Sequence, residues 1–289
     1  MRVLVTGAGG MVGRAVSEHC ASFGDIVLSF DHQNLDISNR EAIRQTLVRE
    51  KPDWVINCAA WTDVDGCEFD PERAFAANAR GPENLAIASA EIGSVLITIS
   101  TDYVFDGLKE GFYTQDDKPN PQSAYATSKL EGERRAQLAY ERSIVVRTGF
   151  VFGPAGKNFL SRVIERARAH ESIRAITDAY GTPTYSRDLS EQLRELARLN
   201  VPGIYHVVNG GEGASFAEFT REALEIDGRS DVTVEEISMD SLRRPAKRPR
   251  NSRLRCLRSE AIGLTALRDW RSSLQEFVKL VPQPVQTSR

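Results

Sequence analysis

The N-terminal segment combines an apolar strand pattern with a run of glycines, and this combination restricts the fold more than any other feature. Residues 1–6 are mostly apolar, and glycines follow at positions 7, 10 and 13, where an amphipathic helical pattern begins. Gly7 suits a tight turn, Gly10 lets a pyrophosphate approach backbone N–H groups, and Gly13 lets the helix pack closely on the strand. A flexible turn would explain the glycines alone, but not the strand and helix around them. The segment therefore predicts a dinucleotide-binding unit.

Strand-like and helix-like segments alternate through residues 1–153, and this alternation is typical of a parallel, doubly wound α/β sheet. After Pro154 the alternation becomes irregular, which indicates a smaller lobe. The elements expected there are helices at residues 158–170, 186–199 and 216–226 and short strands near Ile173 and Ile204. We predict a Rossmann-type domain at residues 1–153 and a C-terminal substrate-binding lobe at residues 154–289, with residues near 178–200 returning to the first domain. Residues 282–289 are expected to be disordered.

Two aspartates follow the second strand pattern, which spans residues 26–30. Asp31 lies about twenty residues past the glycines, where a carboxylate would accept hydrogen bonds from an adenosine ribose. This favours NADH over NADPH, because a 2′-phosphate would meet a negative charge. Nearby cations, which could still favour NADPH, are His32, Arg40 and Arg44. Asp36 could approach the adenine edge or could instead stabilise a turn.

Small residues end the next strand pattern, at residues 52–60. Ala59 and Ala60 would let the backbone lie against a cofactor, and residues 61–65 would form a loop beside it. A helix is expected at residues 71–93, although it contains Gly81. Because an internal glycine costs a helix about 1 kcal/mol relative to alanine, Gly81 indicates close packing.

The chemistry is expected in the stretch from Ser100 to Lys129. The apolar residues 94–99 predict a buried strand, so residues 100–102 should lie at its carboxyl end, where open α/β sheets place their active sites. Tyr125 and Lys129 are four residues apart at the start of a helical pattern, which places phenol and ammonium on one face. The lysine cation would favour the phenolate and lower the tyrosine pKa toward the working range. A hydroxyl of Ser100 or Thr101 could then hold a substrate carbonyl.

The composition narrows the classes of function. The net charge of −3 gives no general attraction to nucleic acid, and with 41% hydrophobic residues the chain contains apolar runs of strand length only. We expect no membrane association and a cytoplasmic location, because the chain begins with a strand pattern instead of a signal peptide. The four cysteines lie at positions 20, 58, 67 and 256, without the spacing of a metal site or a disulfide framework. No metal is therefore expected.

Residues 243–255 are strongly basic in an otherwise acidic chain. The segment is short, interrupted by prolines and without interleaved aromatic residues, which argues against a nucleic-acid site. Two interpretations remain, a solvated face and a clamp for a small phosphorylated ligand such as a sugar nucleotide. The second rests on the arginine side chain, whose planar fork suits pyrophosphate.

Five further segments extend these patterns along the chain. They are NCAAWTDVD at residues 57–65, STDYVFDG at 100–107, YATSKLEGE at 125–133, GTPT at 181–184 and RPRNSRL at 248–254. Together with the glycine segment they resemble extended short-chain dehydrogenases of the dTDP-4-dehydrorhamnose reductase type. The resemblance covers nearly the whole chain and implies reduction of the C4 ketone of dTDP-4-dehydro-β-L-rhamnose to dTDP-L-rhamnose, with NADH or NADPH as cofactor.

The same resemblance implies roles for individual residues. Tyr125 would donate the proton, Lys129 would lower the tyrosine pKa and bind the nicotinamide ribose, and Thr101 would hydrogen-bond the C4 carbonyl oxygen. The expected cofactor-binding residues are Gly7, Gly10, Met11, Val12, Gly13, Asp31, Asp36, Ile37, Ala59, Ala60, Trp61, Thr62, Tyr125 and Lys129. The expected substrate-binding residues are Thr101, Asp102, Tyr103, Tyr125, Phe150, Arg248 and Arg250.

Two positions depart from this family pattern. Ala15 stands where reductases that dimerise through magnesium carry a glutamate, so we expect no essential metal and a monomer or a homodimer. Phe150 stands where tryptophan is frequent. Two other functions remain open, reduction of another 4-keto-6-deoxy sugar nucleotide and a non-catalytic regulatory role resembling the methionine adenosyltransferase β subunit. The combination of Thr101 with Tyr125 and Lys129 favours catalysis, because a binding subunit needs no tuned phenol.

Overall fold

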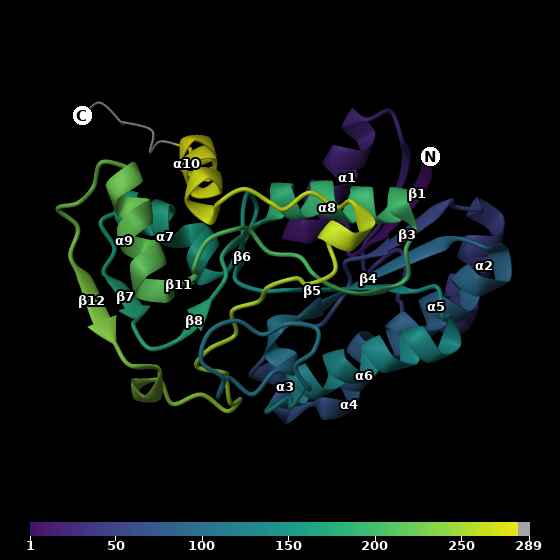
Figure 1. Cartoon of the computed structure of the whole chain (residues 1–289), viewed down its shortest axis with the longest axis horizontal. Helices are drawn as coiled ribbons and strands as arrows, with labels where there is room; N and C mark the ends of the chain where they lie inside the picture. Colours follow the sequence, from purple (N-terminus) through teal and green to yellow (C-terminus); the bar gives the residue numbers. More distant parts are fainter. Residues whose placement is uncertain (283–289) are drawn as a thin grey trace.

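A computed structural model describes residues 1–282 and contains a central parallel sheet of six strands, in the order β10-β5-β4-β3-β1-β2 (Figure 1). The strands are β1 (Arg2–Thr6), β2 (Ile26–Phe30), β3 (Trp54–Asn57), β4 (Val95–Thr101), β5 (Ile144–Thr148) and β10 (Gly203–His206). The predicted doubly wound α/β fold is therefore confirmed. Of the tail predicted to be disordered, residues 283–289 lie outside the described residues.

Helices cover both faces of this sheet, because successive strand residues point to opposite sides. Val3 and Val5 pack in the cluster that contains α1 and α8, whereas Leu4 packs in the cluster that contains α2, α5 and α6. These helices are α1 (Met11–Ser22), α8 (Ser186–Leu199), α2 (Arg40–Glu50), α5 (Gly81–Ile92) and α6 (Ala124–Ala139). Although α8 follows Pro154 in the chain, Figure 1 shows it on the sheet beside α1.

The strand around Ile204 was expected in the lobe, and this assignment is wrong. As β10 it pairs in parallel with β5, so that Ile204 is opposite Val145 and Tyr205 is opposite Val146. Tyr205 is buried among sheet residues and α8 in the same cluster as Val3. The sequence of a four-residue strand does not indicate which sheet the strand joins. Its place in the fold depends on how its side chains pack.

The lobe has its own aromatic core, in which Phe152, Phe219, Trp270 and Phe277 are buried together. Its helices are α7 (Phe159–Arg168), α9 (Phe216–Ile226) and α10 (Trp270–Leu280). Its short strand pairs are β7 (Ile173–Ile176) with β12 (Val234–Ile237), β8 (Tyr180–Gly181) with β11 (Ala214–Ser215), and β6 (Val151–Phe152) with β9 (Thr184–Tyr185). Across the described residues, each helix is too short or too polar to cross a membrane.

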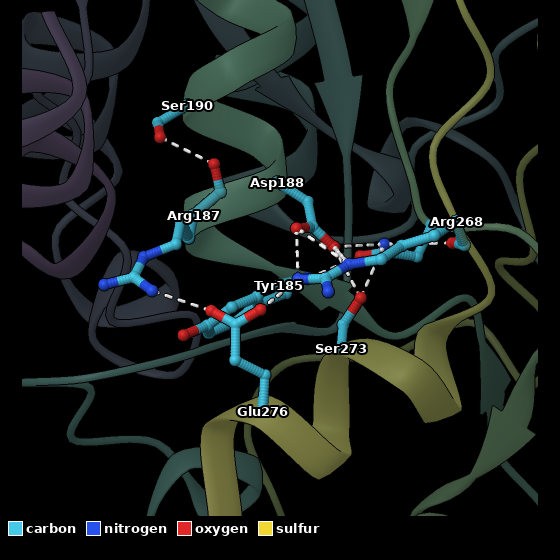
Figure 2. A network of polar contacts seen from close by, with 8 residues as sticks. Tyr185, Arg187, Asp188, Ser190, Arg268, Ser273 and Glu276 are labelled. Carbon is cyan, nitrogen blue, oxygen red and sulfur yellow. Dashed lines mark hydrogen bonds and ion pairs between the residues drawn. The ribbon is translucent and has the colours of Figure 1, made fainter. Parts of the chain in front are cut away.

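A polar network centred on the buried Asp188 carboxylate joins the lobe to the sheet half, as Figure 2 shows. The Asp188 carboxylate on α8 accepts hydrogen bonds from Arg268, at 2.8 Å, and from the Ser273 hydroxyl on α10. Glu276 on α10 pairs with both Arg268 and Arg187, at 2.7 Å each. Because a buried carboxylate needs such partners, the network connects α10 to α8. The domain boundary near residue 153 stays a prediction.

The helix expected at residues 71–93 is divided into three parts. They are α4 (Pro71–Phe75), the π-helical turn η1 (Ala76–Arg80) and α5, preceded by the short α3 (Gly66–Phe69). A Cβ atom on Gly81 would lie 2.5 Å from the Ile37 side chain, which confirms the packing reason for this glycine. Gly132 on α6 similarly lets η1 approach, because its Cβ would lie 2.0 Å from the Asn78 carbonyl oxygen. Short 3₁₀ turns are η2 (Asp102–Val104), η3 (Met239–Ser241) and η4 (Glu260–Ile262).

Candidate active site

A cavity of about 370 Å³ lies between the sheet half and the lobe. It brings together the predicted residues Met11, Val12, Ala59, Ala60, Thr62, Thr101, Asp102, Tyr103, Tyr125, Lys129 and Phe150. The other predicted residues lie outside its lining, namely Gly7, Gly10, Gly13, Asp31, Asp36, Ile37, Trp61, Arg248 and Arg250. The cavity is therefore bordered by the first turn of α1, by the carboxyl ends of β3 and β4, by α6 and by the lobe.

Two glycines at the junction of β1 and α1 allow the close packing that their spacing predicts. Gly7 has a φ of +65°, and a Cβ atom there would lie 2.6 Å from the Ala59 nitrogen. A Cβ atom on Gly13 would lie 2.2 Å from the Gly7 carbonyl oxygen, so only glycine lets α1 approach the loop. Gly10 precedes α1 without a side-chain cap. The uncapped N–H groups at this helix start fit a pyrophosphate.

Asp31, Asp36 and Ile37 have different environments. Asp31 lies next to the glycine loop. A Cβ atom built on Gly9 would lie 3.7 Å from the Cβ atom of Asp31. Asp36 accepts hydrogen bonds from the Ser38 backbone and hydroxyl, at 2.9 and 2.8 Å, so it stabilises a turn, as one of its two interpretations predicted. Ile37 is buried in the core between α2 and α5. Its side chain contributes to packing, and a contact with a cofactor would have to come from its backbone.

The loop that contains Trp61 is held by Asn78, which the sequence did not single out as a site residue. The Asn78 side chain accepts a hydrogen bond from the Trp61 backbone N–H at 2.9 Å and donates to the Trp61 carbonyl at 3.0 Å. It also donates to the Ser128 hydroxyl on α6 at 3.1 Å. The π-helical turn thus places one buried amide between the Trp61 loop and α6. Such turns are frequent at functional sites, but their position is not encoded in hydrophobic periodicity.

Tyr125 is placed in the cavity by the first turn of α6. Ser123 caps this helix by accepting a hydrogen bond from the Ala126 N–H at 3.2 Å. The Tyr125 side chain is buried and meets Tyr103 edge to face, with ring centroids 6.3 Å apart. Burial raises the pKa of Tyr125, and the Thr101 hydroxyl opposes part of this increase. Tyr125 therefore remains protonated at neutral pH, as a proton donor must be.

Lys129 lies one turn further along α6, also buried. Its ammonium group donates a hydrogen bond to the Ile99 carbonyl of β4 at 2.7 Å. Burial lowers the pKa of Lys129 to about 8, against the opposing effect of the Glu133 carboxylate. Burial is the largest influence on the pKa of Tyr125, and it raises that pKa. The expectation that the Lys129 ammonium favours the phenolate stays a prediction.

Asp102 lies directly beside the catalytic candidates with its carboxylate buried. It accepts hydrogen bonds from the Thr101 hydroxyl at 3.0 Å and from the Ser252 hydroxyl. Burial raises the pKa of Asp102 to about 6, while these two hydroxyls lower it. A Cβ atom on Gly149 would lie 2.3 Å from this carboxyl group, so the glycine provides the space for it. A substrate carbonyl would compete with Asp102 for the Thr101 proton.

Ser100 is the second hydroxyl that the sequence offered for the substrate carbonyl. It donates instead to the Glu133 carboxylate, which is buried on α6. Glu133 also binds the buried Arg147 of β5 through two hydrogen bonds, at 2.9 and 2.7 Å. Thr101 is thus the better candidate. The sequence contained a sign of this position, because Glu133 follows Lys129 by four residues, as Lys129 follows Tyr125, and therefore lies on the same helix face.

The lobe contributes an aromatic wall that consists of Phe150, Phe159 and Phe216. Their ring centroids are 4.5 Å apart for Phe150 and Phe216 and 5.8 Å apart for Phe159 and Phe216. Phe150 has a φ of +47°, an unusual backbone conformation for a bulky residue. Gly181 makes room for it, since a Cβ atom there would lie 2.1 Å from the phenyl ring. Phe159 and Phe216 were missed, because lone phenylalanines at helix starts indicate only packing.

The two arginines predicted to contact the substrate are paired with carboxylates. Arg248 binds Asp65 through both terminal nitrogens, at 2.9 and 2.8 Å. Arg250 pairs with Asp178 and with Asp240. Both arginines line a separate groove of about 500 Å³ next to the segment 242–250. Their contact with a substrate stays a prediction.

All four cysteines are free thiols, and Cys58 lines the cavity. Across the part of the chain that the structure describes, no three His, Cys, Asp or Glu side chains are grouped as ligands for a metal ion.

Comparison with known proteins extends over both halves of the molecule. The family model described as RmlD substrate binding domain matches residues 1–282. A protein named dTDP-4-dehydrorhamnose reductase from Mycolicibacterium smegmatis is 40% identical over 283 residues, covering 97% of this chain and 86% of that protein. A dTDP-4-dehydrorhamnose reductase structure from Clostridium acetobutylicum has a TM-score of 0.92 at 36% identity, covering 97% and 99% of the two chains. Another from Bacillus anthracis, in complex with NADP, has a TM-score of 0.91 at 32% identity, covering 96% and 98%.

Proposed function

Because the chain belongs to the dTDP-4-dehydrorhamnose reductase family, we propose that it reduces the C4 ketone of dTDP-4-dehydro-β-L-rhamnose to dTDP-L-rhamnose with NADH or NADPH. The observation that carries this proposal is the cavity where Thr101, Tyr125 and Lys129 meet beside the first turn of α1. A regulatory subunit without catalysis would need a nucleotide site only. The buried phenol, ammonium and hydroxyl in one cavity support an oxidoreductase.

The cofactor-binding residues are proposed from their fit to a dinucleotide. The uncapped start of α1 suits the pyrophosphate, and Asp31 lies beside the glycine loop, where its carboxylate would accept a hydrogen bond from the adenosine ribose. Ala59 and Ala60 leave space at the end of β3, next to Lys129. When bound there, the nicotinamide supplies the hydride that reduces C4. Asp31 favours NADH by charge, whereas the similar Bacillus anthracis structure contains NADP.

The chain's own groups would orient the ketone and supply the proton. Thr101 would donate a hydrogen bond to the C4 oxygen once its hydroxyl turns away from Asp102. Tyr125, which burial keeps protonated, would give its proton to that oxygen as hydride arrives at carbon. Lys129 would bind the nicotinamide ribose with its ammonium group and stabilise the phenolate that remains.

The substrate side of the proposal rests on the lobe. Phe150, with Asp102 and Tyr103, borders the space in front of Tyr125, where the sugar would lie. Arg248 and Arg250 remain candidates for the nucleotide, after exchange of their carboxylate partners. A related 4-keto-6-deoxy sugar nucleotide would be reduced by the same groups. A cytoplasmic location, a monomer or homodimer and a metal-free site are further predictions of this proposal.

The proposal predicts loss of reduced-nicotinamide absorbance when the protein is mixed with dTDP-4-dehydrorhamnose generated in place, with NADH and NADPH tested in parallel. Tyr125→Phe removes the proton donor and should lower kcat by about 10²- to 10⁴-fold. Tyr140→Phe, at the end of the same helix, is the matched control and should keep the wild-type rate. Wild-type turnover that persisted in Tyr125→Phe would contradict the assigned donor, and no turnover with either cofactor would contradict the substrate.

A further inference from the structure

Thr148 lines the catalytic cavity with a hydroxyl group that has no partner. Among the cavity-lining residues in the described part of the chain, it alone has a fully buried side-chain polar atom without a hydrogen bond. Thr148 is the last residue of β5 and is 5% exposed. The hydroxyls at the end of the neighbouring strand have acceptors, because Ser100 donates to Glu133 and Thr101 donates to Asp102. Since a buried hydroxyl is unfavourable without a partner, a ligand in the cavity would gain by supplying one.

The register of the sheet places the Thr148 side chain on the face that α1 and α8 cover. Successive residues of a strand point to opposite faces, and Ile144 and Val146 of β5 pack in the cluster that contains α1 and α8. Thr148 follows Val146 by two residues and pairs in register with Thr101 of β4. The first turn of α1, where the pyrophosphate of a dinucleotide is proposed to bind, borders the same cavity through Val12. The Thr148 hydroxyl and the proposed path of the cofactor therefore share one face of the sheet.

Three aliphatic residues on this face also line the cavity. Val12 of α1, Ile99 of β4 and Val151 of β6 border the cavity and pack against the core cluster of α1 and α8. They form an apolar surface on which the Thr148 hydroxyl is the polar group that lacks a protein partner. A sugar ring carries several hydroxyl groups, most of which would find no hydrogen bond on such a surface. A nicotinamide ring is flat and largely apolar with one polar substituent, its carboxamide, so it matches this surface better.

We propose that the Thr148 hydroxyl binds the carboxamide of the nicotinamide ring. The inference rests on the proposed function and deepens it, because it adds a residue to the cofactor side of the same site. Lys129, which is proposed to bind the nicotinamide ribose, lines the cavity together with Thr148, so the ring attached to that ribose would lie in the same space. A hydroxyl donates and accepts, and a carboxamide offers both an N–H and a carbonyl oxygen, so the bond can form in either orientation of the amide. It would restrict rotation of the ring about its bond to the ribose.

The test compares the cofactor with a fragment that lacks nicotinamide. Thr148→Val should weaken NADPH binding about three- to tenfold in calorimetry, because one hydrogen bond between uncharged groups is lost. Binding of 2′-phospho-ADP-ribose, which lacks only the nicotinamide, should not change, and NADH should differ from ADP-ribose in the same way. The KM for the sugar nucleotide should also stay close to wild type. Thr148→Ser keeps the hydroxyl and should restore NADPH binding.

Ser89→Ala is the matched control. Among the described residues, the Ser89 hydroxyl on α5 is likewise buried without a partner, but Ser89 lies outside the cavity lining, so its loss should change neither affinity. Equal losses for NADPH and for the fragment in Thr148→Val would overturn the assignment. Unchanged NADPH affinity in Thr148→Val would also overturn it, and a raised KM for the sugar nucleotide would then assign the hydroxyl to the sugar. A wild-type protein whose NADPH affinity depends on Thr148 but which turns over no dTDP-4-dehydrorhamnose would contradict the proposed reaction and leave this inference intact.

Discussion

The two walls of the cavity are built on different physical principles. On the sheet side, Thr101, Tyr125 and Lys129 are 6%, 9% and 5% exposed, and protein groups surround each of them. On the lobe side, the wall consists of half-buried phenyl rings with an arginine-rich segment nearby. Groups that transfer or hold a proton need a defined pKa, and burial among partners provides it. Groups that recognise a substrate need accessible surface, and under the proposed function the lobe would provide it.

The largest expected effect concerns the buried support of the sheet side. Glu133→Gln leaves the Arg147 guanidinium buried without its counter-charge, because Glu133 binds it through two hydrogen bonds. The free energy of unfolding should fall by about 3–5 kcal/mol, since removing one partner of a buried ion pair strands the other. Urea unfolding monitored by circular dichroism measures this as a lower midpoint at an unchanged slope.

Glu131→Gln provides the control for this substitution on the same helix. Glu131 pairs with Arg135 at 2.8 Å, but both side chains are about one third exposed, at 32% and 33%. Water and salt screen such a pair, so the expected loss is below about 1 kcal/mol. If the two glutamine variants lost the same stability, the Glu133–Arg147 pair would not support the catalytic helix in the manner described.

The second effect concerns the charge of Lys129. Its pKa is lowered to about 8 by burial, so the ammonium form decreases as the pH rises through this value. If the ammonium binds the nicotinamide ribose, the Kd of NADPH should be constant near pH 6 to 7 and increase toward about tenfold per pH unit above pH 8. Fluorescence titration of NADPH at a series of pH values measures it. Lys129→Arg stays charged and should lose this dependence, whereas a Kd independent of pH in the wild type would contradict the role.

The sheet side could largely be predicted from sequence, because its groups belong to short local patterns. The glycines of the β1–α1 loop follow a strand and precede a helix, and Tyr125 and Lys129 lie one helical turn apart. Such spacings directly determine which side chains share a face. The burial that raises the pKa of Tyr125 could not be read from this spacing, because the extent of burial depends on the whole cavity and not on the nearest charge in the sequence.

The lobe side was less predictable, because its residues come together only in the folded chain. Phe159 and Phe216 begin different helices, and neither position alone distinguishes a site wall from a packing residue. One sheet-side residue was also missed, because Asn78 contacts the Trp61 loop from a π-helical turn, and hydrophobic periodicity does not report such a turn. The basic segment was recognised by composition, but which arginines are paired depends on Asp65, Asp178 and Asp240 elsewhere in the chain.

The smallest expected effect tests the recognition role of the lobe. Phe216→Ala removes apolar surface that contacts both Phe150 and Phe159, but it leaves the groups on the sheet side unchanged. Partial loss of apolar contact should cost about 1 kcal/mol and raise the KM for the sugar nucleotide about fivefold, with kcat and NADPH affinity retained. Phe69→Ala, at a phenylalanine 77% exposed and outside the cavity lining, should leave KM unchanged. A fall in kcat at constant KM would instead show that the aromatic wall acts on the proton transfer itself, and the division between the two walls would then be wrong.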